Sequence, residues 1–114
     1  MSQQSLIKLA IQYFIRRGYK IDKSPSSQDD IKSSKKFDLL VRRGSEVCPV
    51  WIKSWNRTVG VNIVINIDKF AQSAGFSNPI LIAEKFSEHA KAYASRRGIK
   101  LVTKADILRA VKSL

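Results

Sequence analysis

The run at residues 79–83, Pro-Ile-Leu-Ile-Ala, constrains the fold more than any other segment of the chain. No polar residue alternates with its apolar ones, so a strand formed here has apolar side chains on both faces. Strands of this kind lie inside α/β sheets that helices cover on both sides. We therefore expect an α/β protein whose sheet has helices on both faces.

Helix signals occur on both sides of this run. Apolar residues at helical spacing predict a first helix over residues 5–17, which Gly18 ends. Ser87 is the expected N-cap of a helix over residues 88–97. The last helix opens at Thr103, because Thr-Lys-Ala-Asp has the spacing of a capping box with Asp in place of Glu.

Shorter apolar runs predict the remaining strands. We expect them at residues 19–21, 37–41, 47–53 and 99–102, with a hairpin turn at 42–45 joining the second to the third.

The segment 61–75 carries two competing signals. Its first residues are β-branched, which favours a strand, whereas Val64, Ile67 and Phe70 keep helical spacing. We expect a helix in the later part. The predicted order is α-β-β-β-α-β-α-β-α, in a single domain over residues 1–114.

The charge balance indicates a polyanionic partner. Of 114 residues, 21 are Lys or Arg and 9 are Asp or Glu, which gives a net charge of +12 and a pI of about 10.2. Residues 1–57 hold 12 of these cations and 5 acids, residues 58–84 hold 1 and 2, and residues 85–114 hold 8 and 2. This clustering predicts a face that binds nucleic-acid phosphates. The alternative, a solvated charged surface, usually mixes both signs.

Composition excludes several other classes of protein. One cysteine, Cys48, and one histidine, His89, cannot form a Cys/His zinc cage, and a lone cysteine cannot form an internal disulfide. Cys48 lies in an apolar segment, which predicts a buried, inert thiol, and we expect His89 to be exposed and without a role. No apolar run approaches the roughly 18 residues of a membrane span, and the N-terminus has no signal-peptide pattern. The expectation is a soluble, cytoplasmic protein with no membrane partner.

Two charged residues on neighbouring predicted strands could carry chemistry. Hydrolysis of a phosphodiester with a metal ion needs oxygen ligands for the cation and a positive group near the attacking water. Asp38 could hold the metal and Lys53 could handle the water, and alternation places Trp51 on the same strand face as Lys53. The alternative is a solvated Lys53 and an Asp38 that pairs with Lys36 or an arginine.

This arrangement resembles the PD-(D/E)-x-K restriction-endonuclease-like superfamily, which includes Holliday-junction resolvases. The run 51–61, Trp-Ile-Lys-Ser-Trp-Asn-Arg-Thr-Val-Gly-Val, is similar to the Mrr-type branch. The similarity continues at residues 80–83, 86–87, 90, 93–94 and 98–101. The resemblance covers most of the chain and implies a restriction-endonuclease-like fold, an α/β fold with a central mixed β-sheet flanked by helices. It also implies Asp38 as a metal ligand and Lys53 as the catalytic lysine.

The chain departs from that family at one ligand position. Trp51 stands where the family carries Glu, Asp or, in the Mrr-type branch, Gln, and an indole cannot bind Mg²⁺. The first helix also lacks the family's frequent Glu. Asp68 is the best candidate for a substitute carboxylate, whereas Glu46 has the wrong strand parity. These departures indicate a degenerate, non-cleaving site.

We therefore expect a protein that binds double-stranded or branched DNA by phosphate and shape, without a cofactor. One alternative is an active Mg²⁺-dependent endonuclease or resolvase that uses Asp38, Asp68 and Lys53. Another is a non-catalytic subunit with a nuclease or helicase partner, and a homodimer is also left open. Trp51 and Trp55 are either packing residues or stacking platforms for an unpaired base. The expected DNA contacts are Arg16, Arg17, Lys35, Lys36, Arg42, Arg43, Lys53, Trp55, Arg57, Arg96 and Arg97.

Overall fold

The computed structural model describes the chain in two stretches, residues 3–23 and 37–112. Within them, side chains are described except at residues 3–5, 23, 54–57 and 112. The predicted order of elements is confirmed. The elements are α1 (Gln3–Arg16), β1 (Lys20–Lys23), β2 (Leu39–Arg43), β3 (Glu46–Val59), α2 (Val61–Ala74), β4 (Ile80–Phe86), α3 (Glu88–Arg97), β5 (Lys100–Thr103) and α4 (Lys104–Lys112).

The strands form one mixed sheet in the order β1-β2-β3-β4-β5. The pairs β1–β2 and β2–β3 are antiparallel, whereas β3–β4 and β4–β5 are parallel. The predicted central mixed sheet is therefore confirmed. Its apolar run became β4, whose residues 80–83 are all buried.

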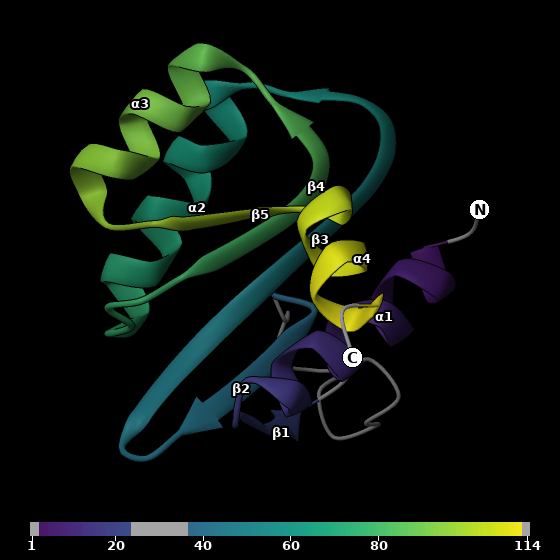
Figure 1. Cartoon of the computed structure of the whole chain (residues 1–114). Helices are drawn as coiled ribbons and strands as arrows, with labels where there is room; N and C mark the ends of the chain where they lie inside the picture. Colours follow the sequence, from purple (N-terminus) through teal and green to yellow (C-terminus); the bar gives the residue numbers. More distant parts are fainter. Residues whose placement is uncertain (1–2, 24–36, 113–114) are drawn as a thin grey trace.

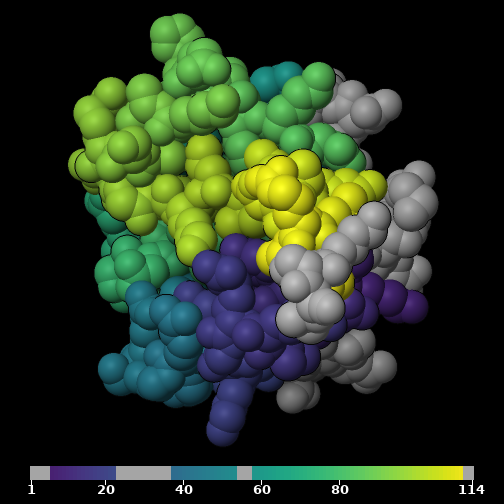
Figure 2. All heavy atoms as spheres, in the orientation of Figure 1, coloured from purple at the N-terminus to yellow at the C-terminus, as the bar shows by residue number. Residues whose placement is uncertain are grey.

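Helices cover both faces of this sheet (Figure 1). Helices α1 and α4 contact each other on one face, and α2 and α3 contact each other on the other face. In Figure 2, α1 and α4 form adjoining parts of the surface in view. Side chains of β3 alternate between the two cores: Val50 and Ile52 pack with the α1 and α4 residues, and Trp51 packs with those of α2 and α3.

Strands β3 and β4 are longer than the local sequence predicted. β3 was expected to end at Lys53, but it continues and pairs Thr58 and Val59 with the end of β4. Long-range pairing between the two strands extends both of them. The hairpin turn is correspondingly shorter, since Arg42 and Arg43 belong to β2 and Gly44, at φ 63°, begins the turn.

Helix α2 confirms the helix expected in the later part of the segment and also includes its β-branched start, where the strand signal competed. Val64 and Ile67 lie on the buried face of this helix, and Gly75 ends the helix at φ 85°. Burial of the apolar helix face outweighs the small β preference of single residues.

Both predicted helix caps are confirmed. The Ser87 hydroxyl accepts a hydrogen bond from the Ala90 N–H at 3.1 Å. In α4, Thr103 and Asp106 each accept the other's backbone N–H at 3.1 Å. The bond from the Thr103 N–H is the main cause of a lowered Asp106 pKa. In the described stretches, no helix combines the length and apolar character that crossing a bilayer requires.

Candidate functional site

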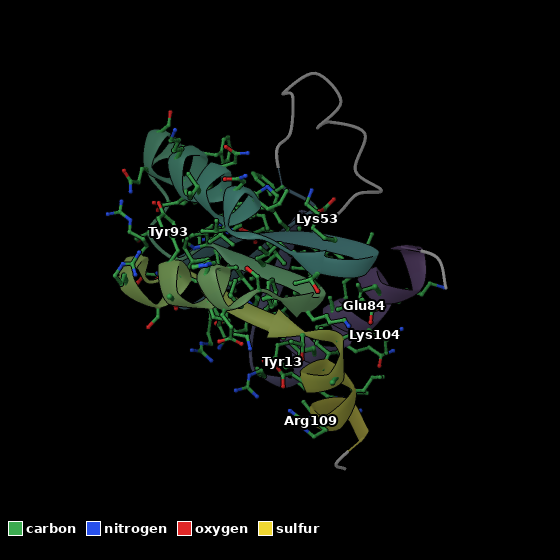
Figure 3. All side chains as sticks on the ribbon, turned by 90° about the horizontal axis from the view of Figure 1, so that it is seen from above. Tyr13, Lys53, Glu84, Tyr93, Lys104 and Arg109 are labelled. Atoms are coloured by element: carbon green, nitrogen blue, oxygen red, sulfur yellow. The ribbon has the colours of Figure 1, made fainter. Side chains whose placement is uncertain are left out.

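Trp51 and Lys53 lie on one side of the sheet, and Asp38 bonds the backbone of the strand that carries them. Trp51 and Lys53 line the same pocket, as strand alternation predicts. Asp38 directly precedes β2, and its Oδ2 accepts a hydrogen bond from the Ile52 N–H at 2.8 Å. The carboxylate thus accepts a backbone N–H of β3 at the point just before β2 begins to pair with that strand. In Figure 3, Lys53 lies on the α2 side of the sheet, and Tyr13 and Arg109 lie on the other side.

Trp51 is part of an aromatic cluster that we define as Phe37, Trp51, Phe70 and Phe76. The centroid of the Phe37 ring lies 6.2 to 6.4 Å from those of the other three rings. The rings of Trp51 and Phe70 are 5.8 Å apart at 82°. Trp51 is 5% exposed, so it is a packing residue with its indole held by the cluster. The position where the resemblance predicts a metal ligand therefore belongs to the apolar core.

A pocket of ≈ 380 Å³ lies beside this cluster, between β3 and α2, and we call it the α2 pocket. Its α2 residues are spaced three and four apart, so they share one helix face. It is lined by Trp51, Lys53, Ile63, Asn66, Ile67 and Phe70.

Asp68 connects α2 to α3. Its Oδ2 accepts hydrogen bonds from the Tyr93 hydroxyl at 2.7 Å and the Arg97 Nε at 2.9 Å, and its Oδ1 accepts one from Gln72 at 3.2 Å. Figure 3 places Tyr93 between the two helices. Burial by itself would raise the pKa of Asp68, but the bonds from Tyr93 and Arg97 outweigh it and the pKa is lowered. Asp68 therefore acts as an ionised link between two helices.

The donor atoms at this site do not suit a hard cation. Asp38 uses one oxygen on the Ile52 backbone, Trp51 offers no oxygen, and both oxygens of Asp68 accept hydrogen bonds. Mg²⁺ is held by several oxygen ligands in near-octahedral geometry. In the part of the chain that the structure describes, no three His, Cys, Asp or Glu side chains form a group that could hold a metal ion. The described residues thus do not fit Mg²⁺.

The chain segments that carry the three arginine pairs, the ends of α1, β2 and α3, lie at the end of the sheet where the β2–β3 hairpin turns. Arg43 donates from its NH1 to the Arg17 carbonyl at 3.2 Å. Arg43 also lines a pocket of ≈ 220 Å³ together with Gly98 and Lys100, and Gly98 directly follows Arg97. We call this region the arginine end, made of residues 16–17, 42–43, 96–97 and Lys100.

Neighbouring groups orient several of these guanidinium groups. Arg42 bonds the Asp22 carboxylate at 2.7 Å, and that hydrogen bond raises the Arg42 pKa. Arg43 stacks over the Tyr19 ring at 4.6 Å. Arg97 is 45% exposed although it bonds Asp68. A guanidinium has five N–H donors, so one partner leaves others for phosphate oxygens.

Some predicted contacts cannot be placed. Lys35 and Lys36 lie outside the described residues, and so do the side chains of Trp55 and Arg57, so these four stay predictions. The prediction for Cys48 is confirmed, since it is 1% exposed and burial raises its pKa.

Sequence reasoning missed four residues of the site: Phe37, Asn66, Phe70 and Tyr93. Helical spacing extended back to Val61 would have placed Asn66 on one face with Phe70, but the start of that segment carried a competing strand signal. No local signal links Tyr93 to a carboxylate 25 residues away.

Comparison with protein families gives one match over nearly the whole chain. Residues 1–111 match the model of the Mrr catalytic domain, described as a restriction endonuclease. A comparison with curated proteins finds no match.

Three solved structures have a similar fold. A protein of unknown function, AF1548, has a TM-score of 0.66 at 20% identity, over 89% of this chain and 56% of its own. A repair endonuclease from Pyrococcus abyssi has a TM-score of 0.65 at 17% identity, over 90% of this chain and 46% of its own. EndoMS, solved as a complex with double-stranded DNA, has a TM-score of 0.61 at 14% identity, over 90% of this chain and 45% of its own. The chain thus spans about half the length of these proteins, and the predicted restriction-endonuclease-like fold is confirmed.

Proposed function

We propose that this chain, which belongs to the Mrr catalytic-domain family of restriction endonucleases, binds DNA without cutting it. In this proposal the protein recognises the phosphate backbone and the shape of DNA, with little preference for sequence.

The observation that carries the proposal is the burial of Trp51 beside Lys53. At the position where the resemblance implies a ligand, an indole packs in the aromatic cluster, Lys53 lines the adjoining pocket and Asp38 bonds the Ile52 backbone. Asp68 does not supply the missing ligand in this arrangement, because its oxygens bind Tyr93, Arg97 and Gln72. A catalytic lysine next to a single carboxylate lacks the coordination that would fix the cation and the attacking water.

The arginine end supports DNA as the partner. It gathers cations from the C-terminal ends of α1 and α3 and from the β2–β3 hairpin, which are far apart in the sequence. A group of cations on one side of a protein with net charge +12 favours a polyanion.

Purified protein tests the proposal in two assays. In titrations of a labelled duplex, log K should fall with log[salt] at a slope of about −3 or steeper, since each phosphate contact contributes about −0.9. A slope no steeper than about −1 would contradict DNA binding. In a plasmid assay with Mg²⁺ or Mn²⁺ we expect no nicking. Metal-dependent nicking that disappears in Lys53→Ala would contradict the non-cleaving proposal.

Trp51→Glu tests the ligand position directly. A second carboxylate beside Asp38 should produce a measurable Mn²⁺ binding heat in calorimetry, which wild type and Trp51→Leu should lack. We do not expect cutting to return, because catalysis needs groups held within about 0.5 Å of productive geometry. Absence of that heat in a folded Trp51→Glu protein would show that Asp38 is not placed to share a metal.

A further inference from the structure

The α2 pocket has the size and the lining of a ligand site. Pockets of 300 to 1,000 Å³ that combine apolar walls with a few polar groups are typical of small-molecule sites, and this one measures ≈ 380 Å³. We propose that it binds one unpaired nucleobase extruded from DNA. This inference rests on the proposed function and names the feature of DNA that the protein recognises.

The apolar walls suit a flat aromatic ligand. Trp51 and Ile67, at 5% and 4% exposure, form the most buried part of the lining, and Ile63 and Phe70 are half-buried. The rings of Trp51 and Phe70 meet at 82°. Phe70, which is half-buried, can stack against a planar base, and the Trp51 indole forms part of the apolar floor beneath it. Stacking of this kind accepts any base, because every base has a π-face.

The pocket rim holds two polar side chains that suit a nucleotide. Asn66 is exposed on α2, and its amide offers both a donor and an acceptor, the pair that an adenine edge requires and that other bases can also use. Lys53 lines the pocket from β3 and supplies a cation for a flanking phosphate. A purely apolar partner side chain would use neither group.

The aromatic cluster packs against two walls of this pocket. Phe37 contacts Trp51 and Phe70 from outside the lining, and its ring lies 6.2 Å from that of Phe76. The two aromatic walls thus pack against other rings of the protein as well as lining the pocket. A site that is already formed lowers the ordering cost of binding.

The test compares a matched duplex with the same duplex carrying one bulged thymine. The readout is the ratio of the two dissociation constants. Wild type should bind the bulged duplex roughly 10-fold more tightly, in the range that stacking of one base supplies. Asn66→Ala should lower this ratio severalfold, and Ile63→Trp, which fills the pocket, should bring it close to one. Asn62→Ala is the matched control, since Asn62 is an exposed asparagine one turn earlier on α2 and does not line the pocket.

Permanganate probing locates the base independently. A bulged thymine is oxidised when unstacked, so wild type should protect it and Ile63→Trp should not. Phe70→Ala should also lose protection, whereas Asn62→Ala, at an exposed position outside the lining, should retain it. Thermal unfolding of each variant checks that the fold is intact.

The outcomes separate this inference from the proposed function. Salt-dependent binding of the matched duplex with no preference for the bulge would overturn the base pocket and leave DNA binding in place. A preference that survives in Ile63→Trp without thymine protection would show recognition of DNA bending, which also overturns the pocket. Failure to bind either duplex would overturn both. Binding of an apolar peptide that Ile63→Trp blocks, with no thymine protection, would assign the pocket to a protein partner.

Discussion

At the scale of single residues, the carboxylates of Asp38 and Asp68 accept hydrogen bonds that hold parts of the fold together. Asp38 accepts the Ile52 N–H at the start of the β2–β3 ladder, and Asp68 joins α2 to α3. Removing such an acceptor leaves the donor group without its partner, which costs about 1–3 kcal/mol of stability when that donor is buried. Both roles are structural and need no metal ion.

We expect Asp68→Asn to lower the free energy of unfolding at pH 7 by about 1–3 kcal/mol. The pKa of Asp68 is lowered in the folded state, so ionised Asp68 stabilises the protein above its unfolded pKa of about 3.9. That contribution is lost as the pH falls through the folded pKa. Urea unfolding between pH 7 and pH 3 should therefore show a flatter pH dependence in Asp68→Asn. Asp22→Asn, which alters an exposed ion pair with Arg42, is the control and should change stability little.

At the scale of elements, local caps set where α3 and α4 begin. Ser87 and the Thr103–Asp106 pair bond backbone N–H groups that the first helical turn leaves unsatisfied. Helix α3 has much to gain from its cap, because only Ala90 and Ala94 of its residues are buried. Packing alone gives this helix little apolar area.

Ser87→Ala should destabilise the protein by about 1 kcal/mol through loss of the N-cap bond to Ala90. Ser95→Ala makes the same change at an exposed position inside α3 and should be neutral or slightly stabilising, since alanine has the higher helix propensity. Denaturant titrations of both variants measure the difference. Equal destabilisation by the two would show that the cap contributes nothing specific.

At the scale of the whole molecule, the sheet separates two surfaces. The α2 pocket lies under α2 on one face, the arginine end lies where the hairpin turns, and α1 with α4 covers the other face. Arg43 pairs with the first residue of β3, whereas Lys53 lies midway along that strand, in which each residue advances about 3.3 Å. DNA that contacts both therefore runs along the length of the molecule.

Arg43→Ala should reduce the salt slope of DNA binding by about 1, because one phosphate contact is removed. Arg109→Ala removes the same charge from α4, on the opposite side of the sheet from Lys53, where Arg109 is 73% exposed. It should leave the slope unchanged. Fluorescence anisotropy of a labelled duplex from 50 to 300 mM salt, about the range where such slopes are measured, compares the two. Equal slopes for both variants would place DNA away from the arginine end.

The sequence by itself determined the features that act over a few residues. Ser87 and Thr103 cap helices through bonds to residues three positions away, and strand alternation put Trp51 and Lys53 on one face. The apolar run at 79–83 became the buried strand β4, because neither face of such a run tolerates water. The family match also follows from sequence over residues 1–111.

Only the tertiary structure decided how distant segments meet. It showed α2 as helical from Val61, since burial of one helix face outweighs the β preference of single residues. It placed Asp68 against Tyr93 and Arg97, 25 and 29 residues away. The α2 pocket likewise exists because β3 and α2 present complementary faces to each other. Such contacts depend on chain topology and packing, which no local spacing encodes.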